Sequence, residues 1–145
     1  MPGLLAVVLA IVAVSGSRPA SAQEAKSVSG QSLGSGDAVA RGKYIVEDVA
    51  MCGTCHTPRL SNGQLDYSHW LKGGPVPYQA AYPASNWPLT EPRIGGTLPT
   101  SDAGMITLLT TAVWIDGKPL RDPMPKFHMS RSDAEAVVAY LKSLR

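Results

Sequence analysis

The sequence predicts an all-α domain in which a few helices and long loops surround an interior that the side chains alone do not fill. Apolar residues recur at helical spacing in three segments, and no strand-like alternation is sustained between them. Residues 57–99 contain seven Pro and five Gly, and a loop of this length in a compact domain usually serves a function or wraps something. The chain has 14 Gly and 12 Pro but only one Phe, five Tyr and three Trp. We therefore expect an internal scaffold to complete the core.

Three helices are expected from the apolar spacing and from capping residues. The first is predicted over about residues 38–50, with Asp37 as its N-cap and apolar positions at Val39, Ile45, Val46 and Val49. The second is predicted over about residues 101–112, where Ser101 can cap the first turn. The third follows residues 130–133, which have the spacing of a capping box, and it carries apolar residues at i, i+3, i+4 and i+7.

The N-terminal residues are not expected to belong to the fold. Residues 3–14 form an unbroken apolar run, and the small residues Ala20-Ser21-Ala22 that follow match a signal-peptidase site. The next stretch is rich in Ser and Gly, shows no hydrophobic period and is typical of a flexible tether. We therefore divide the chain into a signal peptide (1–22), a flexible linker (23–36) and a folded domain (37–145).

The charge balance excludes two classes of partner. The 145 residues include 13 Lys and Arg against 11 Asp and Glu, which gives a net charge of +2 and a pI near 8.6. The sequence holds no basic stripe for nucleic acid and no polybasic cluster for a membrane surface. The apolar run 3–14 is also shorter than the roughly 20 residues that a helix needs to span a bilayer. We expect no nucleic-acid partner and no stable membrane span.

The two cysteines of the chain, Cys52 and Cys55, are followed directly by His56. Cys-x-x-Cys-His is the attachment pattern of c-type haem. Two thiols one helical turn apart can each add across a haem vinyl group, and the adjoining histidine is then brought beneath the iron, where Nε2 can coordinate. One covalently attached haem c would also fill the centre of a small, loop-rich chain.

Other uses of these cysteines fit the sequence less well. A dithiol oxidoreductase places its Cys-x-x-Cys motif at a strand-to-helix junction, whereas here a predicted helix runs into Cys52. A zinc site needs about four ligands, and only three histidines accompany the two thiols. A disulfide between Cys52 and Cys55 would close a very short loop and stabilise little.

The second axial position of the iron decides what such a haem can do. Met124 is the favoured distal ligand, because prolines on both sides hold it in a stiff loop and a weak thioether ligand must be held in place. Met51 adjoins the first cysteine and cannot reach the opposite face, and Met105 falls on the apolar side of a predicted helix. Met129 and His128 stay as alternatives, although Met129 is also placed to pack ahead of the last helix cap.

These features together resemble a monohaem class I cytochrome c. The resemblance rests on Cys52–His56, on the Met124-Pro125-x-Phe127 segment and on the closing residues Val138-Ala139-Tyr140-Leu141, and it extends over residues 37–145. It implies the class I cytochrome c fold, with Met124 as the distal iron ligand and a close contact between the first and last helices. Gly42 and Tyr140, with Tyr44 nearby, are the counterparts of that contact. The segment Cys52–Arg59 further resembles cytochrome subunits that serve bacterial periplasmic dehydrogenases.

The sequence departs from the family pattern at two points. The spacing from Gly42 to Cys52 is longer than in compact members, and no T-G-P-N-L segment follows His56. The carbonyl that orients His56 through its other ring nitrogen is therefore not identified, and we expect a proline of the following loop to supply it. Candidate hydrogen-bond donors to the haem propionates are Arg59, Trp70, Trp87 and Arg93.

These observations predict an electron-transfer protein rather than an enzyme. With His56 and Met124 both on the iron, no position is open for oxygen, peroxide or substrate, and the haem exchanges single electrons through its edge. We expect a periplasmic carrier, acting alone or as the cytochrome subunit of a dehydrogenase or respiratory chain. Its partners would be a dehydrogenase donor and an oxidase or other acceptor. The alternatives are a haem enzyme or gas sensor with Met124 off the iron, and a dithiol oxidoreductase without haem.

Overall fold

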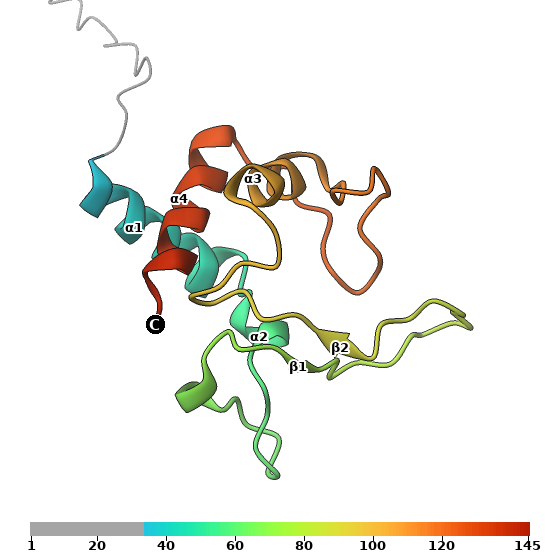
Figure 1. Ribbon diagram of the computed structural model, residues 1–145. Coiled ribbons are helices and arrows are strands. Elements are labelled where there is room, and N and C mark those ends of the chain that lie inside the picture. The colour runs from blue at the N-terminus through green and yellow to red at the C-terminus, as the bar shows by residue number, and fades with distance from the viewer. Residues whose placement is uncertain (1–33) are drawn as a thin grey trace, which may run out of the picture. The chain divides into compact units, whose positions relative to one another are not determined.

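The structure, a computed structural model, describes residues 34–145 (Figure 1). The predicted signal peptide and residues 23–33 of the predicted linker lie outside the described residues. The first helix, α1 (Ser35–Tyr44), begins inside the predicted linker, and its N-cap is Gly34 rather than Asp37. Asp37 lies instead in the first turn, where a negative charge interacts favourably with the positive end of the helix dipole.

A π-helical turn accounts for the long spacing between Gly42 and the cysteines. The backbone runs from α1 directly into η1 (Ile45–Val49), where the N–H of Ala50 donates to the carbonyl of Ile45 five residues earlier at 2.7 Å. A π-turn holds more residues than an α-turn, so the extra length is taken up inside the helix. Met51 then adopts a left-handed conformation with φ of 47°, which redirects the chain into the short helix α2 (Gly53–His56).

The two later helices begin at the capping residues that the sequence indicates. In α3 (Asp102–Thr111), Ser101 Oγ accepts a hydrogen bond of 3.2 Å from the backbone N–H three residues on. In α4 (Arg131–Ser143), Ser130 Oγ accepts the equivalent hydrogen bond at 3.1 Å. Each serine satisfies a donor of the first turn that has no partner inside the helix. The predictions for these two helices are confirmed to within one residue at their N-termini.

Helices α1 and α4 cross at a contact with no room for a side chain (Figure 1). A Cβ atom on Gly42 would lie 1.9 Å from the carbonyl oxygen of Ala136 and 2.8 Å from Cβ of Tyr140. The Tyr140 hydroxyl donates a hydrogen bond to Glu47 of η1, which ties α4 to the turn that follows α1. The glycine–aromatic contact that the resemblance implied is therefore present. Tyr44 is exposed and lies under the guanidinium of Arg41.

The hydrophobic core lies where α1, η1, α3 and α4 meet two loop positions, Leu71 and Ile94. Its buried members are Ile45, Val46, Leu71, Ile94, Met105, Leu108, Leu109, Ala134, Val137, Val138, Tyr140 and Leu141. These side chains are mostly aliphatic, and no Phe or Trp of residues 34–145 is fully buried. The packed core is therefore small, as the scarcity of aromatic residues predicts.

The long loop between α2 and α3 contains a narrow antiparallel ribbon. Strands β1 (Gly74–Pro75) and β2 (Thr90–Glu91) pair with Gly74 opposite Glu91, and the chain between them extends away from the helices (Figure 1). A 3₁₀ turn, η2 (Tyr67–His69), precedes it. The all-α prediction is confirmed apart from this small sheet, whose two-residue strands are too short to produce a detectable alternation.

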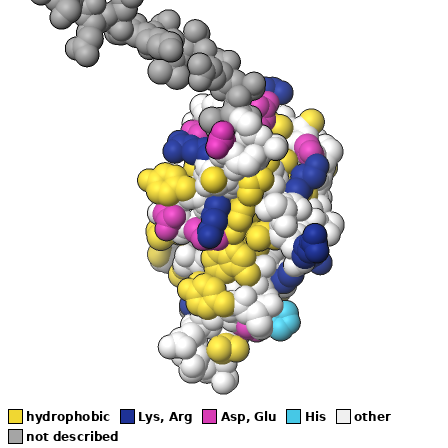
Figure 2. Space-filling model, turned by 90° about the vertical axis from the view of Figure 1, so that its left-hand side faces the viewer, with side chains coloured by type: hydrophobic (Ala, Val, Ile, Leu, Met, Phe, Trp, Pro, Cys, Tyr) yellow, Lys and Arg dark blue, Asp and Glu magenta, His cyan; other side chains and the backbone are white. Residues whose placement is uncertain are grey.

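The face shown in Figure 2 carries mixed charge around a broken band of apolar side chains. Basic and acidic side chains both border this band, so the face presents no field of one sign that would attract a nucleic acid. Within residues 34–145, every helix is too short or too polar to cross a membrane.

Candidate functional site

A cavity of about 760 Å³ lies between the helices and the long loops. This volume falls within the range of about 300–1,000 Å³ that is typical of sites for small molecules and cofactors. Helices α3 and α4 and the loop before α4 supply most of its apolar wall. The apolar lining residues include Ile94, Met105, Leu108, Leu109, Trp114, Leu120, Phe127, Val137 and Leu141.

One wall of the cavity is the turn that carries both cysteines. Cys52 is the N-cap residue of α2, and its carbonyl accepts a hydrogen bond of 2.9 Å from the N–H of His56. The two cysteines are therefore one helical turn apart, and both thiols are free. Cys52, Cys55 and His56 all line the cavity, as the motif predicts.

His56 is held with one ring nitrogen engaged and the other unused. Its Nδ1 atom lies 2.8 Å from the carbonyl oxygen of Pro92, and because a carbonyl only accepts, Nδ1 must carry the proton. The proline expected to orient His56 is thus Pro92. Nε2 then presents a lone pair, yet it is fully buried and has no hydrogen-bond partner. A buried polar atom without a partner costs about 1–3 kcal/mol, so a ligand atom is expected there.

The environment of the thiols argues against dithiol redox chemistry. Burial raises the pKa of Cys52 to about 11, and burial together with the nearby Glu91 carboxylate raises the pKa of Cys55. Reactive cysteines of dithiol oxidoreductases have lowered pKa values, because the thiolate is the nucleophile. No group of three or more His, Cys, Asp or Glu in the described part of the chain could hold a metal ion by itself.

Three of the four methionine candidates line the cavity. Met124 lines the cavity from the loop before α4, where the N–H of Met124 donates to the carbonyl of Arg121 at 3.2 Å. Met105 and Met51 also line it, but Met105 is a buried core residue of α3 and Met51 adjoins the first cysteine. The other candidates, Met129 and His128, are not lining residues. Met129 packs against the core ahead of α4 instead.

Residues 39–145, nearly the whole described part, match the protein family described as "Cytochrome c". The chain belongs to the cytochrome c family. A curated relative, described as "Diheme cytochrome c-type" from Cereibacter sphaeroides, is 57% identical over 37 residues. That match covers 26% of this chain and 12% of the relative, so the chain spans only a small part of the relative's length.

Membership of the cytochrome c family implies a covalently attached c-type haem and a role in electron transfer. The residues of the cavity fit such a group on structural grounds. The unpaired Nε2 of buried His56 is a nitrogen donor suited to iron, and the free thiols of Cys52 and Cys55 lie within one helical turn of it on the same wall. The mainly apolar lining suits the porphyrin faces, and a haem held by these residues would complete the core of this cytochrome c.

The side chains that the sequence suggested as propionate partners lie elsewhere in this cytochrome c. Arg59 donates to the carbonyls of Gly63 and Thr54, Trp87 to that of Tyr78, and Arg93 to that of Gly95; these are hydrogen bonds of 2.7–3.1 Å. Trp70 packs on Gly53 with its indole N–H buried and unpaired. The four side chains are absent from the cavity lining of residues 34–145. Arg59, Trp87 and Arg93 direct these donors to backbone carbonyls, a use that single-residue chemistry does not reveal.

Trp114 and Glu91 are among the lining residues that sequence reasoning missed. Trp114 follows the end of α3, and Glu91 is about nine-tenths buried just before the carbonyl that holds His56. Trp114 lies in a short loop between α3 and Met124, and this position was the available signal for it. Nothing in the sequence indicates that Glu91 lines the cavity, since its strand has only two residues.

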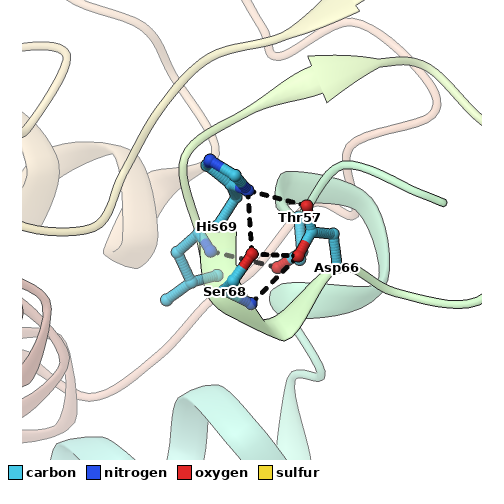
Figure 3. A network of polar contacts seen from close by, with 5 residues as sticks. Thr57, Asp66, Ser68 and His69 are labelled. Carbon is cyan, nitrogen blue, oxygen red and sulfur yellow. Dashed lines mark hydrogen bonds and ion pairs between the residues drawn. The ribbon is translucent and has the colours of Figure 1, made fainter.

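A polar cluster on the loop after α2 has a structural role (Figure 3). The Asp66 carboxylate accepts hydrogen bonds from the backbone N–H of Ser68 at 3.0 Å, from the Ser68 hydroxyl and from Nδ1 of His69 at 2.7 Å. A nucleophilic triad requires the imidazole between the hydroxyl and the carboxylate, whereas here both contact the same nitrogen. The cluster caps η2, and Thr57 Oγ1 accepts from the N–H of Leu71 at 3.0 Å to close the loop beside His56.

Proposed function

We propose that this cytochrome c is a one-electron carrier with a single haem attached to Cys52 and Cys55 and with His56 and Met124 as axial ligands. The observation that carries the proposal is the buried, unpaired Nε2 of His56 in a cavity that Met124 also lines. The chain contains only two cysteines, which supports one attachment site. The relative described as diheme matches only over a short segment and does not argue for a second haem here.

The residues around the cavity would each act on the electron transfer in a definite way. Haem c, when bound, supplies a reversible ferric–ferrous couple. The Pro92 carbonyl keeps Nδ1 of His56 protonated, which fixes the ring orientation and raises the basicity of Nε2. A thioether from Met124 favours the ferrous state and so raises the potential relative to two histidines. The apolar wall excludes water, which disfavours the state with the higher charge.

Filling both axial positions also limits the chemistry. If His56 and Met124 both hold the iron, no coordination site would be left for oxygen, peroxide or a substrate, and electrons would pass through the haem edge. The reactions of enzymes and gas sensors need an open or readily opened position. The proposal therefore assigns electron transfer, and not catalysis, to this site.

The proposal extends to location and partners. The apolar run at residues 3–14 and the Ala-Ser-Ala segment that follows favour export to the periplasm with cleavage after Ala22. The likeness of Cys52–Arg59 to cytochrome subunits of periplasmic dehydrogenases favours a dehydrogenase as donor and an oxidase or other carrier as acceptor. Mass spectrometry of the exported holoprotein tests the cleavage: a mature chain beginning at Gln23 supports it, and an uncleaved chain contradicts it.

The visible spectrum of the exported holoprotein tests the ligation. We expect haem that stays with the chain after denaturation and acid–acetone extraction, a low-spin ferric spectrum and a long-wavelength charge-transfer band from a thioether on iron. Met124→Leu should abolish the band, whereas the matched change Met105→Leu on the same cavity should leave it. A high-spin protein that binds carbon monoxide readily would refute the carrier assignment, and a colourless protein with two titratable thiols would refute haem binding.

A further inference from the structure

The ribbon between β1 and β2 is held together by its own hydrogen bonds from its base out to Tyr78 and Trp87. The backbone pairs Gly74 with Glu91, and the N–H of Val76 donates to the carbonyl of Leu89 at 3.0 Å. Further out, Nε1 of Trp87 donates to the carbonyl of Tyr78 at 3.1 Å. Residues 74–91, called the ribbon below, therefore form a hydrogen-bonded hairpin and not an irregular loop.

The two residues that flank the base of the ribbon both form hydrogen bonds with His56. Gly73, directly before the ribbon, donates its N–H to the carbonyl of His56 at 2.8 Å. Pro92, directly after the ribbon, accepts the hydrogen bond from Nδ1 of the same residue. Gly73 has a φ of 78°, and a Cβ there would lie 2.6 Å from the carbonyl oxygen of Glu91, so the two strands are tightly apposed at this point.

The outer part of the ribbon contacts the loop that carries Met124. The hydroxyl of Tyr82 donates a hydrogen bond of 3.1 Å to the carboxylate of Asp122. Nη1 of Arg121 makes a longer contact, 3.5 Å, with the carbonyl of Asn86. Arg121 is also the residue whose carbonyl accepts the hydrogen bond from the N–H of Met124. The ribbon thus touches the turn that sets the position of Met124.

We propose that the ribbon is a brace between the two axial ligands, and that Tyr82 and Asp122 are positioning residues which keep Met124 on the iron. The proposal rests on the ligation proposed above. A thioether binds iron weakly, so the fraction of molecules with Met124 detached depends on how firmly its loop is held. At its base the ribbon continues directly into Pro92, whose carbonyl holds His56. The Tyr82–Asp122 hydrogen bond therefore connects the Met124 loop, through the ribbon, to the side of the site that carries His56.

The size of the effect follows from the strength of one hydrogen bond. A typical intramolecular hydrogen bond changes an equilibrium by a factor of about two to ten. An external ligand that binds only when Met124 is detached has an apparent affinity proportional to the detached fraction. Loss of the Tyr82 hydrogen bond should therefore raise that apparent affinity about two- to tenfold.

The experiment is an imidazole titration of the ferric holoprotein, followed by loss of the thioether charge-transfer band. Tyr82→Phe should tighten imidazole binding about two- to tenfold and keep the band in the absence of imidazole. Tyr44→Phe is the matched control, because this exposed tyrosine lies on α1 and its hydroxyl makes no hydrogen bond within residues 34–145. Asp122→Asn, which keeps an acceptor oxygen, should have a smaller effect than Asp122→Ala.

A double-mutant cycle separates the brace from a general loss of stability. Because Tyr82→Phe and Asp122→Ala remove the same hydrogen bond, the double variant should bind imidazole no more tightly than the stronger single variant. Fully additive effects, or a Tyr82→Phe titration identical to that of Tyr44→Phe, would overturn the brace while the proposed ligation stands. A wild-type holoprotein without the thioether band would refute the ligation itself, and the brace with it.

Discussion

The substitution Gly42→Ala tests whether the contact between α1 and α4 organises this cytochrome c. The added Cβ would lie 1.9 Å from the carbonyl oxygen of Ala136 and 2.6 Å from its carbonyl carbon. Real Cβ atoms almost never approach closer than 3.0 Å, so the two helices would have to separate by about 1.1 Å. The obstructing atoms belong to the backbone and cannot rotate away, unlike the end of a flexible side chain.

The expected cost combines two opposing effects. Overpacking a tight contact costs about 1–3 kcal/mol and more when backbone must move, and replacing a helical glycine by alanine returns about 1 kcal/mol. Because the obstructing atoms are backbone and α4 also carries Tyr140 and the buried face of the core, we expect an overpacking cost at the upper end of this range, about 3 kcal/mol, and a net loss of about 2 kcal/mol. For a domain of this size, that corresponds to a fall in the melting temperature on the order of 10 °C.

Denaturant unfolding of the holoprotein, followed by far-ultraviolet circular dichroism, measures this loss. Gly36→Ala is the matched control, because the same change is made in the same helix at a site with nothing within 4 Å of the added Cβ. It should be neutral or stabilise the protein by up to about 1 kcal/mol. A Gly42→Ala protein within about 1 kcal/mol of wild type would show that the helices separate at little cost, which contradicts the packing argument.

Three further predictions follow from local contacts. Gly53→Ala would place a Cβ 2.0 Å from the indole ring of Trp70, so we expect less covalently bound haem per chain, measured by extracted absorbance, with partial recovery in Gly53→Ala/Trp70→Leu. Ser130→Ala removes the cap of α4 and should lower the free energy of unfolding by about 1 kcal/mol; an unchanged denaturation midpoint would refute the role of the cap. The hydrogen bond from Arg41 holds the pKa of Asp133 below its usual 3.8, so this carboxylate stabilises the fold above pH 3.8 and the stabilisation disappears as the pH falls through the lower native value. The difference in stability between wild type and Asp133→Asn should accordingly shrink on acidification, and a difference that grows would contradict this sign.

The sequence revealed those parts of the site that depend on residues close together in the chain. Cys52, Cys55 and His56 lie within one turn, so their shared wall follows from the motif. Ser101 and Ser130 cap their helices through hydrogen bonds to residues three positions further along the chain, so a local sequence pattern predicts them. The position of Met124 at the cavity is also understandable, because the rigid proline-flanked segment is short and adjoins a well-marked helix.

The remaining parts depend on long-range contacts that leave no local pattern. Pro92 lies 36 residues from His56, and one of seven prolines in the loop had to be chosen. The ribbon has only two-residue strands, which leave no alternation to detect, and its outer part is joined by the side-chain hydrogen bond of Trp87. The same tryptophan was a candidate for a polar group of the haem, and its N–H is instead engaged within the ribbon. Likewise, the π-turn η1 has no sequence signature of its own.

Adjacent residues of helix α4 contribute to two different surfaces. Ala136 and Tyr140 meet Gly42 of α1, while Val137 and Leu141, one position further along each time, form part of the cavity wall. A rotation or shift of this helix cannot change one surface and spare the other. Substitutions at the cavity wall that change the redox potential would therefore also disturb the packing of α4 against α1. Stabilising substitutions at the crossing would in turn shift the potential. In this cytochrome c, the redox potential and the helix packing therefore depend on neighbouring residues of one helix.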